Sequence, residues 1–254
     1  MAYKERLDEI LARRGFSTNR KIRRFLQRNV VEVNNIRALT GGIKVSLFED
    51  TIKINGKDSN LQPDCFIMMN KKSGYICSNA VDKNLKTEIP LVFNFLPDEI
   101  VQNKNLGTLH TIGRLDVDTE GLLVFTTNGD FSHKIALPEC HINKTYEIIL
   151  EKECTLEMQN HYISECEKGI SVCEEWNSPA FTCRSAALVF LSPVKCRLTI
   201  SEGKYHQVKR MIAALGNKVA YLKRISMGSL KLDSALEPGQ WRFLSPDELE
   251  LFFE

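Results

Sequence analysis

Residues 110–130 read HTIGRLDVDTEGLLVFTTNGD, a polar loop followed by an apolar strand. Glycines at 113 and 121 flank the loop, and Leu122 to Phe125 form the buried strand that it enters. Arg114 and Asp116 lie two residues apart in the loop, so both side chains can project toward one pocket. On spacing alone, an Arg-x-Asp pair before a strand is more often a structural ion pair than a reactive one.

The sequence on both sides of this segment predicts a mostly β body with a few helices, an α+β fold. Strand patterns occupy roughly 65–69, 121–127, 144–150, 180–190, 194–201 and 219–226. A helix between the last two has apolar residues at Val208, Met211, Ile212 and Leu215. Ser245-Pro-Asp-Glu is a capping box that opens a terminal helix. We expect a mostly antiparallel mixed sheet flanked by helices over residues 64–254.

The N-terminal segment has a different charge from the body. Residues 1–57 contain 13 Lys+Arg and 6 Asp+Glu, a net +7, while the remaining 197 residues carry a net −5. Apolar spacing predicts a helix over 3–14 that ends at Gly15, and a second helix capped by Ser17 or Thr18. Short strands follow, with a turn at Asn34-Asn35. The two helices present basic side chains on their outer surfaces: Arg13, Arg14, Arg20, Lys21, Arg23, Arg24 and Arg28.

These features predict a small RNA-docking unit at 1–58, a polar linker at 59–63, and the α+β body after it. A dense basic face binds polyanions through phosphate charge and carries little base identity. A solvated basic face with no ligand is the alternative, and nothing suggests a DNA-recognition helix. No apolar run approaches the roughly 20 residues of a membrane span, and the N-terminus lacks a secretory signal. We therefore expect a cytoplasmic protein that does not bind membranes.

The cysteine spacing argues against zinc and disulfides. None of the eight cysteines forms a Cys-x-x-Cys pair, which a zinc ribbon or finger requires. Without an export signal, reduced thiols are expected. We predict neither a metal nor a disulfide.

Several motifs together resemble the RsuA/RluB/RluE/RluF group of pseudouridine synthases. Gly113-Arg-Leu-Asp and the residues up to Asp130 resemble its signature motif. Lys144-Thr-Tyr146-Glu and residues 198–211 (LTISEGKYHQVKRM) resemble the second and third motifs, in the same order. Residues 69–75 match the domain entry, and two stretches, Arg6 to Ala12 and Ser17 to Val33, resemble the S4 RNA-binding domain. The resemblance covers essentially the whole chain.

The resemblance assigns roles to individual residues and implies catalysis without a cofactor. Asp116 corresponds to the catalytic aspartate, which acts as a nucleophile or stabilises and deprotonates the sugar. Tyr146 corresponds to a tyrosine that stacks on the flipped pyrimidine and can help to remove its C5 proton. Lys209 corresponds to the basic residue that keeps the aspartate ionised, with Arg210 as the runner-up. Arg114 corresponds to the arginine that fills the space of the flipped base, and Leu222 to a leucine of the uracil pocket.

Within the group, the chain is most similar to the type that modifies 16S ribosomal RNA. The grounds are the sequence His206-Gln-Val-Lys-Arg-Met and the termination at Phe253-Glu254 without a long basic tail. We expect a monomer that acts on small-subunit RNA, naked or in an assembling particle. A large-subunit (23S) enzyme of the same group is the first alternative. An S4-type, ribosome-associated RNA-binding factor without catalysis is the second.

Overall fold

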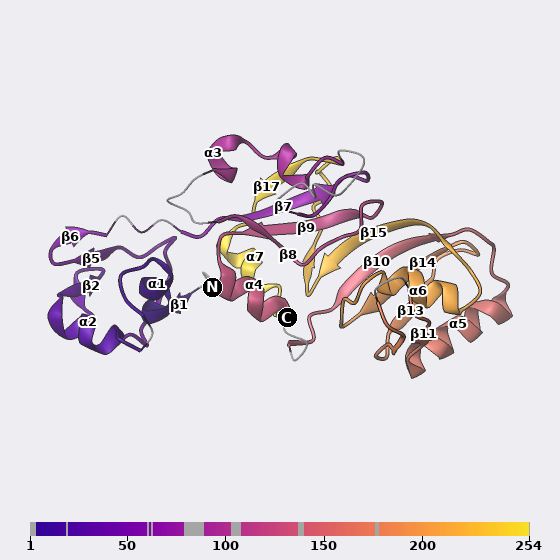
Figure 1. Cartoon of the computed structure of the whole chain (residues 1–254), viewed down its shortest axis with the longest axis horizontal. Helices are drawn as coiled ribbons and strands as arrows, with labels where there is room; N and C mark the ends of the chain where they lie inside the picture. The colour runs from indigo at the N-terminus through magenta and orange to yellow at the C-terminus, as the bar shows by residue number, and fades with distance from the viewer. Residues whose placement is uncertain are drawn as a thin grey trace.

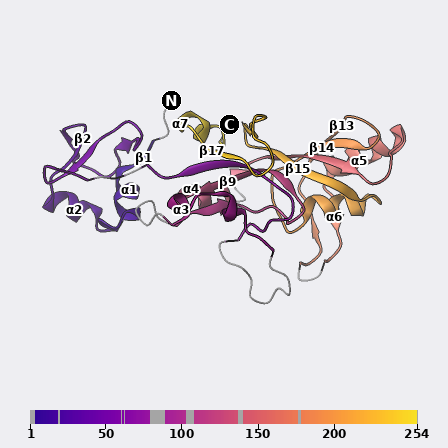
Figure 2. The same ribbon diagram turned by 90° about the horizontal axis from the view of Figure 1, so that it is seen from above.

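The computed structural model describes residues 4–18, 20–59, 61, 63–78, 89–102, 108–136, 140–175 and 178–253. The chain is elongated in both views, with a small N-terminal unit at one end and α5 (Leu156–Lys168) at the other (Figure 1, Figure 2). Across the described residues, we find no helix with the length and apolarity that crossing a membrane requires.

The N-terminal unit has its own hydrophobic core. Leu7, Ile10 and Leu11 are fully buried and pack with Ile22 and Leu26 of the second helix, apart from the clusters of the body. A four-stranded sheet, in the order β3-β2-β5-β6, and the pair β1-β4 complete the unit. The elements are β1 (Glu5–Arg6), α1 (Leu7–Arg13), α2 (Ile22–Arg28), β2 (Val31–Val33), β3 (Ile36–Arg37), β4 (Lys44–Val45), β5 (Ile52–Ile54) and β6 (Lys57–Asp58).

The first helix is shorter than the predicted 3–14. It begins at Leu7 because the two residues before it form β1, which pairs with Lys44–Val45. Its end is as predicted: Gly15 follows the helix with a φ of +78°, a left-handed conformation that glycine adopts without strain. Tertiary pairing therefore changed the start of the helix, while local chemistry set its end.

Two further local signals had different outcomes. The predicted cap at Ser17 or Thr18 is wrong, because α2 begins after Lys21 and has no side-chain cap. The turn at Asn34-Asn35 is confirmed, since both residues have positive φ, 52° and 64°, between the paired strands β2 and β3. Asparagine tolerates this conformation, which tight hairpin turns require.

The body is built on a nine-stranded sheet in the order β13-β14-β10-β15-β9-β7-β17, with β16 beside β15 and β8 beside β9. The pairing of β15 with β9 is parallel, and the other pairings within this sheet are antiparallel. The expected α+β class with a mixed sheet is confirmed. The strands are β7 (Phe66–Lys71), β8 (His110–Ile112), β9 (Glu120–Thr126), β10 (Lys144–Leu150), β13 (Ala187–Phe190), β14 (Lys195–Ile200), β15 (Val219–Met227), β16 (Leu230–Lys231) and β17 (Trp241–Phe243).

Both faces of the sheet are buried along β7 and β9, whereas β10, β13 and β14 alternate between buried and more exposed side chains. Along β9, Leu123 and Phe125 belong to one hydrophobic cluster, whereas Leu122 and Val124 belong to another, because successive side chains point to opposite faces. The first cluster includes residues of α5 and of α6 (Gln207–Ala214). The second includes residues of α4 (Gly129–Ala136) and α7 (Pro246–Glu250). A 3-10 turn (Val92–Phe95) and α3 (Asp98–Val101) lie between β7 and β8 in the chain.

The segment 180–190, predicted as one strand, is two. Phe181–Thr182 forms β12, which pairs with β11 (Ser171–Val172) in a separate two-stranded sheet. Only Ala187–Phe190 joins the large sheet, as β13. The small sheet contacts α6 through β11. This contact brings the loop between β11 and β12 close to the start of that helix.

Gly121 allows the backbones of β9 and β15 to approach closely. Its φ is +99°, and a Cβ atom built there would lie 2.2 Å from the backbone oxygen of Arg224. The parallel pairing of the two strands includes this pair of residues. Glycine is therefore required where the strand that follows the Asp116 loop meets the strand that carries Leu222.

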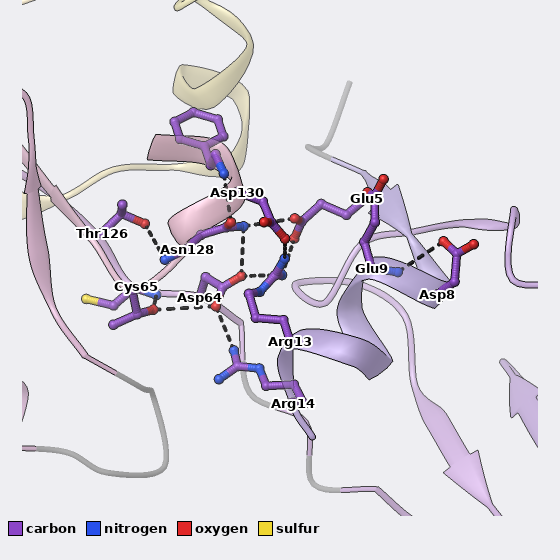
Figure 3. A network of polar contacts seen from close by, with 12 residues as sticks. Glu5, Asp8, Glu9, Arg13, Arg14, Asp64, Cys65, Thr126, Asn128 and Asp130 are labelled. Carbon is purple, nitrogen blue, oxygen red and sulfur yellow. Dashed lines mark hydrogen bonds and ion pairs between the residues drawn. The ribbon is translucent and has the colours of Figure 1, made fainter. Parts of the chain in front are cut away.

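Charged side chains join the N-terminal unit to the body (Figure 3). Asp64, whose side chain is 2% exposed, accepts hydrogen bonds from Arg13 (2.7 Å) and Arg14 (2.8 Å) of the N-terminal unit. Asn128 donates to Asp64 and to Glu5, and Glu5 also pairs with Arg13 at 3.0 Å. The described residues of the predicted linker, 59, 61 and 63, belong to no helix or strand.

This junction corrects the predicted exposure of two arginines. The side chains of Arg13 and Arg14 are only 14% and 11% exposed, because Asp64 holds both. Arg20, Lys21 and Arg24 lie on the exposed surface as expected. The basic surface of the helices is therefore smaller than the sequence suggested.

Candidate active site

The Asp116 loop connects β8 to β9 and is fixed from beneath by a buried lysine. Lys71 is fully buried at the end of β7, and its ammonium donates to the backbone oxygens of Val117 (3.0 Å) and Thr119 (2.8 Å). The loop turns back on itself through a hydrogen bond from the Thr119 amide to the Asp116 oxygen, 3.1 Å long. Burial lowers the pKa of Lys71. These bonds fix the backbone of the loop at Asp116 and in the three residues that follow it.

Asp116 pairs with Lys209, the residue of the third motif that was predicted to contact it. The Lys209 ammonium lies 3.1 Å from Oδ2 of Asp116 and donates to Asp118 at 2.6 Å. Burial would lower the pKa of Lys209, but the hydrogen bond to Asp118 and the charge of Asp116 raise it above its ordinary value. Lys209 therefore stays protonated and forms an ion pair at the carboxylate of Asp116.

Asp118 differs from Asp116 in its surroundings. Burial would raise the pKa of Asp118, but the hydrogen bond and the charge of Lys209 lower it. The Asp118 side chain is 69% exposed, whereas that of Asp116 is 29% exposed and faces a cavity. Asp118 is thus a solvated partner of the lysine, and Asp116 is the carboxylate that a substrate in the cavity would meet.

The cavity has a volume of about 530 Å³, which is large enough for a nucleotide. Tyr146 on β10 and Leu222 on β15 line it and are 7% and 5% exposed. In the β10–β15 pairing Tyr146 lies opposite Arg224, and Ile148 lies opposite Leu222, so these side chains share one face of the sheet. The structure therefore brings an aromatic ring and an aliphatic side chain together near Asp116.

The remaining predicted site residues divide into two groups. Arg114 lines the cavity and is exposed at its rim. Arg210, the runner-up for the contact with Asp116, does not line the cavity. The residue is 6% exposed, and its guanidinium donates to the backbone oxygens of Cys173 and Pro179 and to the Ser178 hydroxyl. The geometry therefore favours Lys209 over Arg210 as the partner of the carboxylate.

Sequence reasoning assigned no role to four charged or titratable residues at the site. Lys144 and Arg224 line the cavity, and burial followed by the charge of Arg224 lowers the pKa of Lys144 to about 8. His206 also lines the cavity, and its Nδ1 lies 3.1 Å from Glu175. Lys144 and His206 lie inside the motifs quoted above, so the motifs contained a signal for them. Glu175 had none, because only the fold brings its loop to the site.

Neither a metal site nor a disulfide is present in the described part of the chain. No three His, Cys, Asp or Glu side chains there gather in a way that could hold a metal ion. All eight cysteines are free thiols. Burial raises the pKa of Cys166 and of Cys196 to about 12, so these thiols stay protonated.

Comparison with known sequences places this site in a family. A sequence model described as RNA pseudouridylate synthase matches residues 65–214, which include β7, the Asp116 loop and α6. The chain belongs to the RNA pseudouridylate synthase family. The expected identification as a pseudouridine synthase, an isomerase, is therefore confirmed.

Several relatives of this synthase match over nearly their full length. The ribosomal small subunit pseudouridine synthase A of Pasteurella multocida is 36% identical over 97% of this chain and 99% of its own. The protein of the same name from Haemophilus influenzae is 34% identical over 96% and 98%. An uncharacterised RNA pseudouridine synthase of Bacillus subtilis, YtzG, is 33% identical over 98% of both chains. A crystal structure of a pseudouridylate synthase superposes with a TM-score of 0.66 at 33% identity, covering 97% of this chain and 99% of that one.

Proposed function

We propose that this synthase converts uridine to pseudouridine in RNA of the small ribosomal subunit, with Asp116 as its catalytic carboxylate. The observation that carries the proposal is the pairing of Asp116 with Lys209 at the wall of a nucleotide-sized cavity. Small-subunit specificity is supported by the names of the relatives that match over nearly the whole chain.

The reaction needs a carboxylate that is ionised and close to the sugar. Pseudouridine forms when the bond between N1 of uracil and C1′ of ribose breaks, the base turns, and C5 bonds to C1′. An ionised Asp116 can attack C1′ or stabilise the positive charge that develops there. Lys209, 3.1 Å from Oδ2 of Asp116, pairs with the carboxylate and can hold it beside the cavity until the sugar arrives.

The base reaches the cavity only if its nucleotide leaves the RNA helix. Tyr146 offers a ring on which the uracil can stack, and Leu222 offers an apolar surface beside it. A phenol at this place can also assist in removing the C5 proton. Arg114, exposed at the rim, would fill the space that the nucleotide leaves in the RNA, as the resemblance implies.

The N-terminal unit, which resembles an S4 domain, would select the RNA. Its exposed cations on and before α2 can contact phosphates, while Arg13 and Arg14 tie the unit to the body. Because one cavity accepts any uridine that reaches it, selectivity would come from simultaneous docking of the two units on folded RNA. We propose that the active protein is a monomer without a cofactor.

Pseudouridine mapping with purified RNAs tests the substrate. The synthase is incubated with 16S RNA, with 23S RNA and with partly assembled small subunits. We expect modification of one or very few uridines in the 16S RNA, faster in the assembling particle than in naked transcript. Modification of 23S RNA at a comparable rate would assign the protein to the large subunit. Absence of pseudouridine from every RNA would favour a binding factor without catalysis.

A further inference from the structure

His206 lies between two carboxylates at the edge of the cavity. Its Nε2 is 3.7 Å from Oδ1 of Asp116, and its Nδ1 is 3.1 Å from Oε1 of Glu175. The residue precedes α6 with a φ of +49° and a ψ of +26°. This left-handed conformation is unfavourable for a residue with a β-carbon, and such strain collects at functional sites. The side chain is 24% exposed, so protons can reach it from solvent.

Charged side chains of both signs surround the imidazole. Asp116, Asp118 and Glu175 are negative neighbours, and Lys209 is a positive neighbour that pairs with Asp116. The Tyr205 ring stacks on the other side, with 3.8 Å between ring centroids. A neutral imidazole that donates from Nδ1 to Glu175 would turn an unprotonated Nε2 toward Asp116, whereas an imidazolium has an N–H for each carboxylate.

We propose that His206, oriented by Glu175, carries the proton that the isomerisation moves between N1 and C5 of the uracil. This inference rests on the proposed function and adds a group to its chemistry. When the N1–C1′ bond breaks, its electron pair stays on the base, and N1 takes the proton from Nε2 of His206. After the base turns, the C5–C6 π pair forms the new bond to C1′. The C5 proton then returns to Nε2, and its bonding pair restores the double bond.

Asp116 couples the charge of His206 to the progress of the reaction. When Asp116 attacks C1′, its oxygen forms a covalent bond and its negative charge disappears. The imidazolium then loses one of its two counter-charges and gives up its proton to N1. When C5 displaces the carboxylate, the negative charge beside the imidazole returns, and the imidazole accepts the C5 proton. The cycle as a whole consumes no proton and releases none.

Arg210 gives this arrangement a structural support. It holds both sides of the loop that carries Glu175, through the backbone oxygens of Cys173 and Pro179. Glu175 and Ser178 exchange two backbone hydrogen bonds, 2.9 and 2.8 Å long, within the same loop. Arg210 is therefore a positioning residue that sets the place of Glu175, which in turn orients His206.

Single-turnover kinetics of variants of the full chain test the proposal. His206→Gln keeps a polar side chain but cannot carry a proton, and we expect a rate about 100-fold lower with unchanged RNA affinity. The rate of the wild type should fall toward high pH, because an imidazole without its second proton has none to give to N1, and this fall should be absent from His206→Gln. Glu175→Gln should keep the fall but move its midpoint to lower pH, because the imidazolium loses a counter-charge. The matched control is His161→Gln on α5, outside the cavity, which should behave as the wild type.

Chemical rescue separates a proton carrier from a packing residue. Free imidazole should raise the rate of His206→Ala at least tenfold, and it should leave the rate of the wild type unchanged. Rates of His206→Gln within threefold of the wild type, or a His206→Ala variant that imidazole does not restore, would overturn the proposal. In either case the wild type still forms pseudouridine, whereas failure of the proposed function would leave the wild type itself inactive.

Discussion

Asp64→Asn should loosen the N-terminal unit from the body without disturbing either core. The substitution keeps the size of the side chain and removes the negative charge that lies between Arg13 and Arg14. Asp64 is almost fully buried, so its two charge-assisted hydrogen bonds are shielded from water. Breaking a buried ion pair by neutralising one partner typically costs about 3–5 kcal/mol.

The expected cost here is at the lower end of that range or just below it. Both arginines retain some contact with water, and Arg13 keeps Glu5 at 3.0 Å as a second partner. We therefore expect a loss of about 2–3 kcal/mol from the coupling between the two units. The asparagine can still accept a hydrogen bond from one guanidinium, which limits the loss further.

Urea unfolding and limited trypsin digestion measure this effect. The variant should lose cooperativity between the two units, and cleavage after Lys57, in β6, should accelerate. Glu165→Gln is the matched control, because it breaks an exposed pair with Lys168 and should leave the unfolding transition and the digestion pattern like those of the wild type. A free energy of unfolding of Asp64→Asn within about 0.5 kcal/mol of the wild type, with unchanged digestion, would refute the assigned role of the junction.

Three further variants test the site, the sheet and the basic surface. Lys209→Met should lower the single-turnover rate roughly 100-fold, which corresponds to about 3 kcal/mol of activation free energy, while RNA affinity stays within threefold of the wild type. A loss of affinity without a loss of rate would make Lys209 a phosphate contact. Gly121→Ala should destabilise the body by more than about 2 kcal/mol in thermal unfolding, because its Cβ would meet the backbone oxygen of Arg224. An unchanged melting temperature would contradict the close approach of β9 and β15 at this residue. Neutralising three exposed cations should make RNA affinity less dependent on salt concentration. The slope of log affinity against log salt should fall by about 0.7–0.9 for each phosphate that the surface no longer neutralises. An unchanged slope would mean that these cations are a solvated surface and do not contact RNA. The three are Arg20, Lys21 and Arg24.

The sequence predicted those parts of the fold that depend on local chemistry. The end of α1 at Gly15 and the turn at Asn34-Asn35 follow from the conformations that these residues tolerate. The capping box at Ser245 is present as predicted, with reciprocal hydrogen bonds to Glu248. Each of these signals lies within a few residues of the feature it sets, so no tertiary information was needed.

Features that depend on distant parts of the chain were not predictable. The start of α1 was shifted by pairing with β4, and residues 180–190 were divided by pairing with β11. Arg13 and Arg14 looked like RNA contacts because the sequence gives no sign that Asp64 faces them. Motifs named the residues around Asp116 and favoured Lys209 over Arg210. The geometry agrees with that preference, because these adjacent residues on a helix point in different directions.

The most direct test of the central claim is the rate of pseudouridine formation by Asp116→Asn, measured beside Asp118→Asn. Both aspartates contact Lys209, but only Asp116 lines the cavity. In a single-turnover assay on small-subunit RNA, Asp116→Asn should form no detectable pseudouridine while it binds RNA and melts like the wild type. Asp118→Asn should retain a rate within about tenfold of the wild type, because it removes a solvated ion pair. If Asp116→Asn retains a rate within tenfold of the wild type, another residue carries the chemistry and the assignment of Asp116 is wrong.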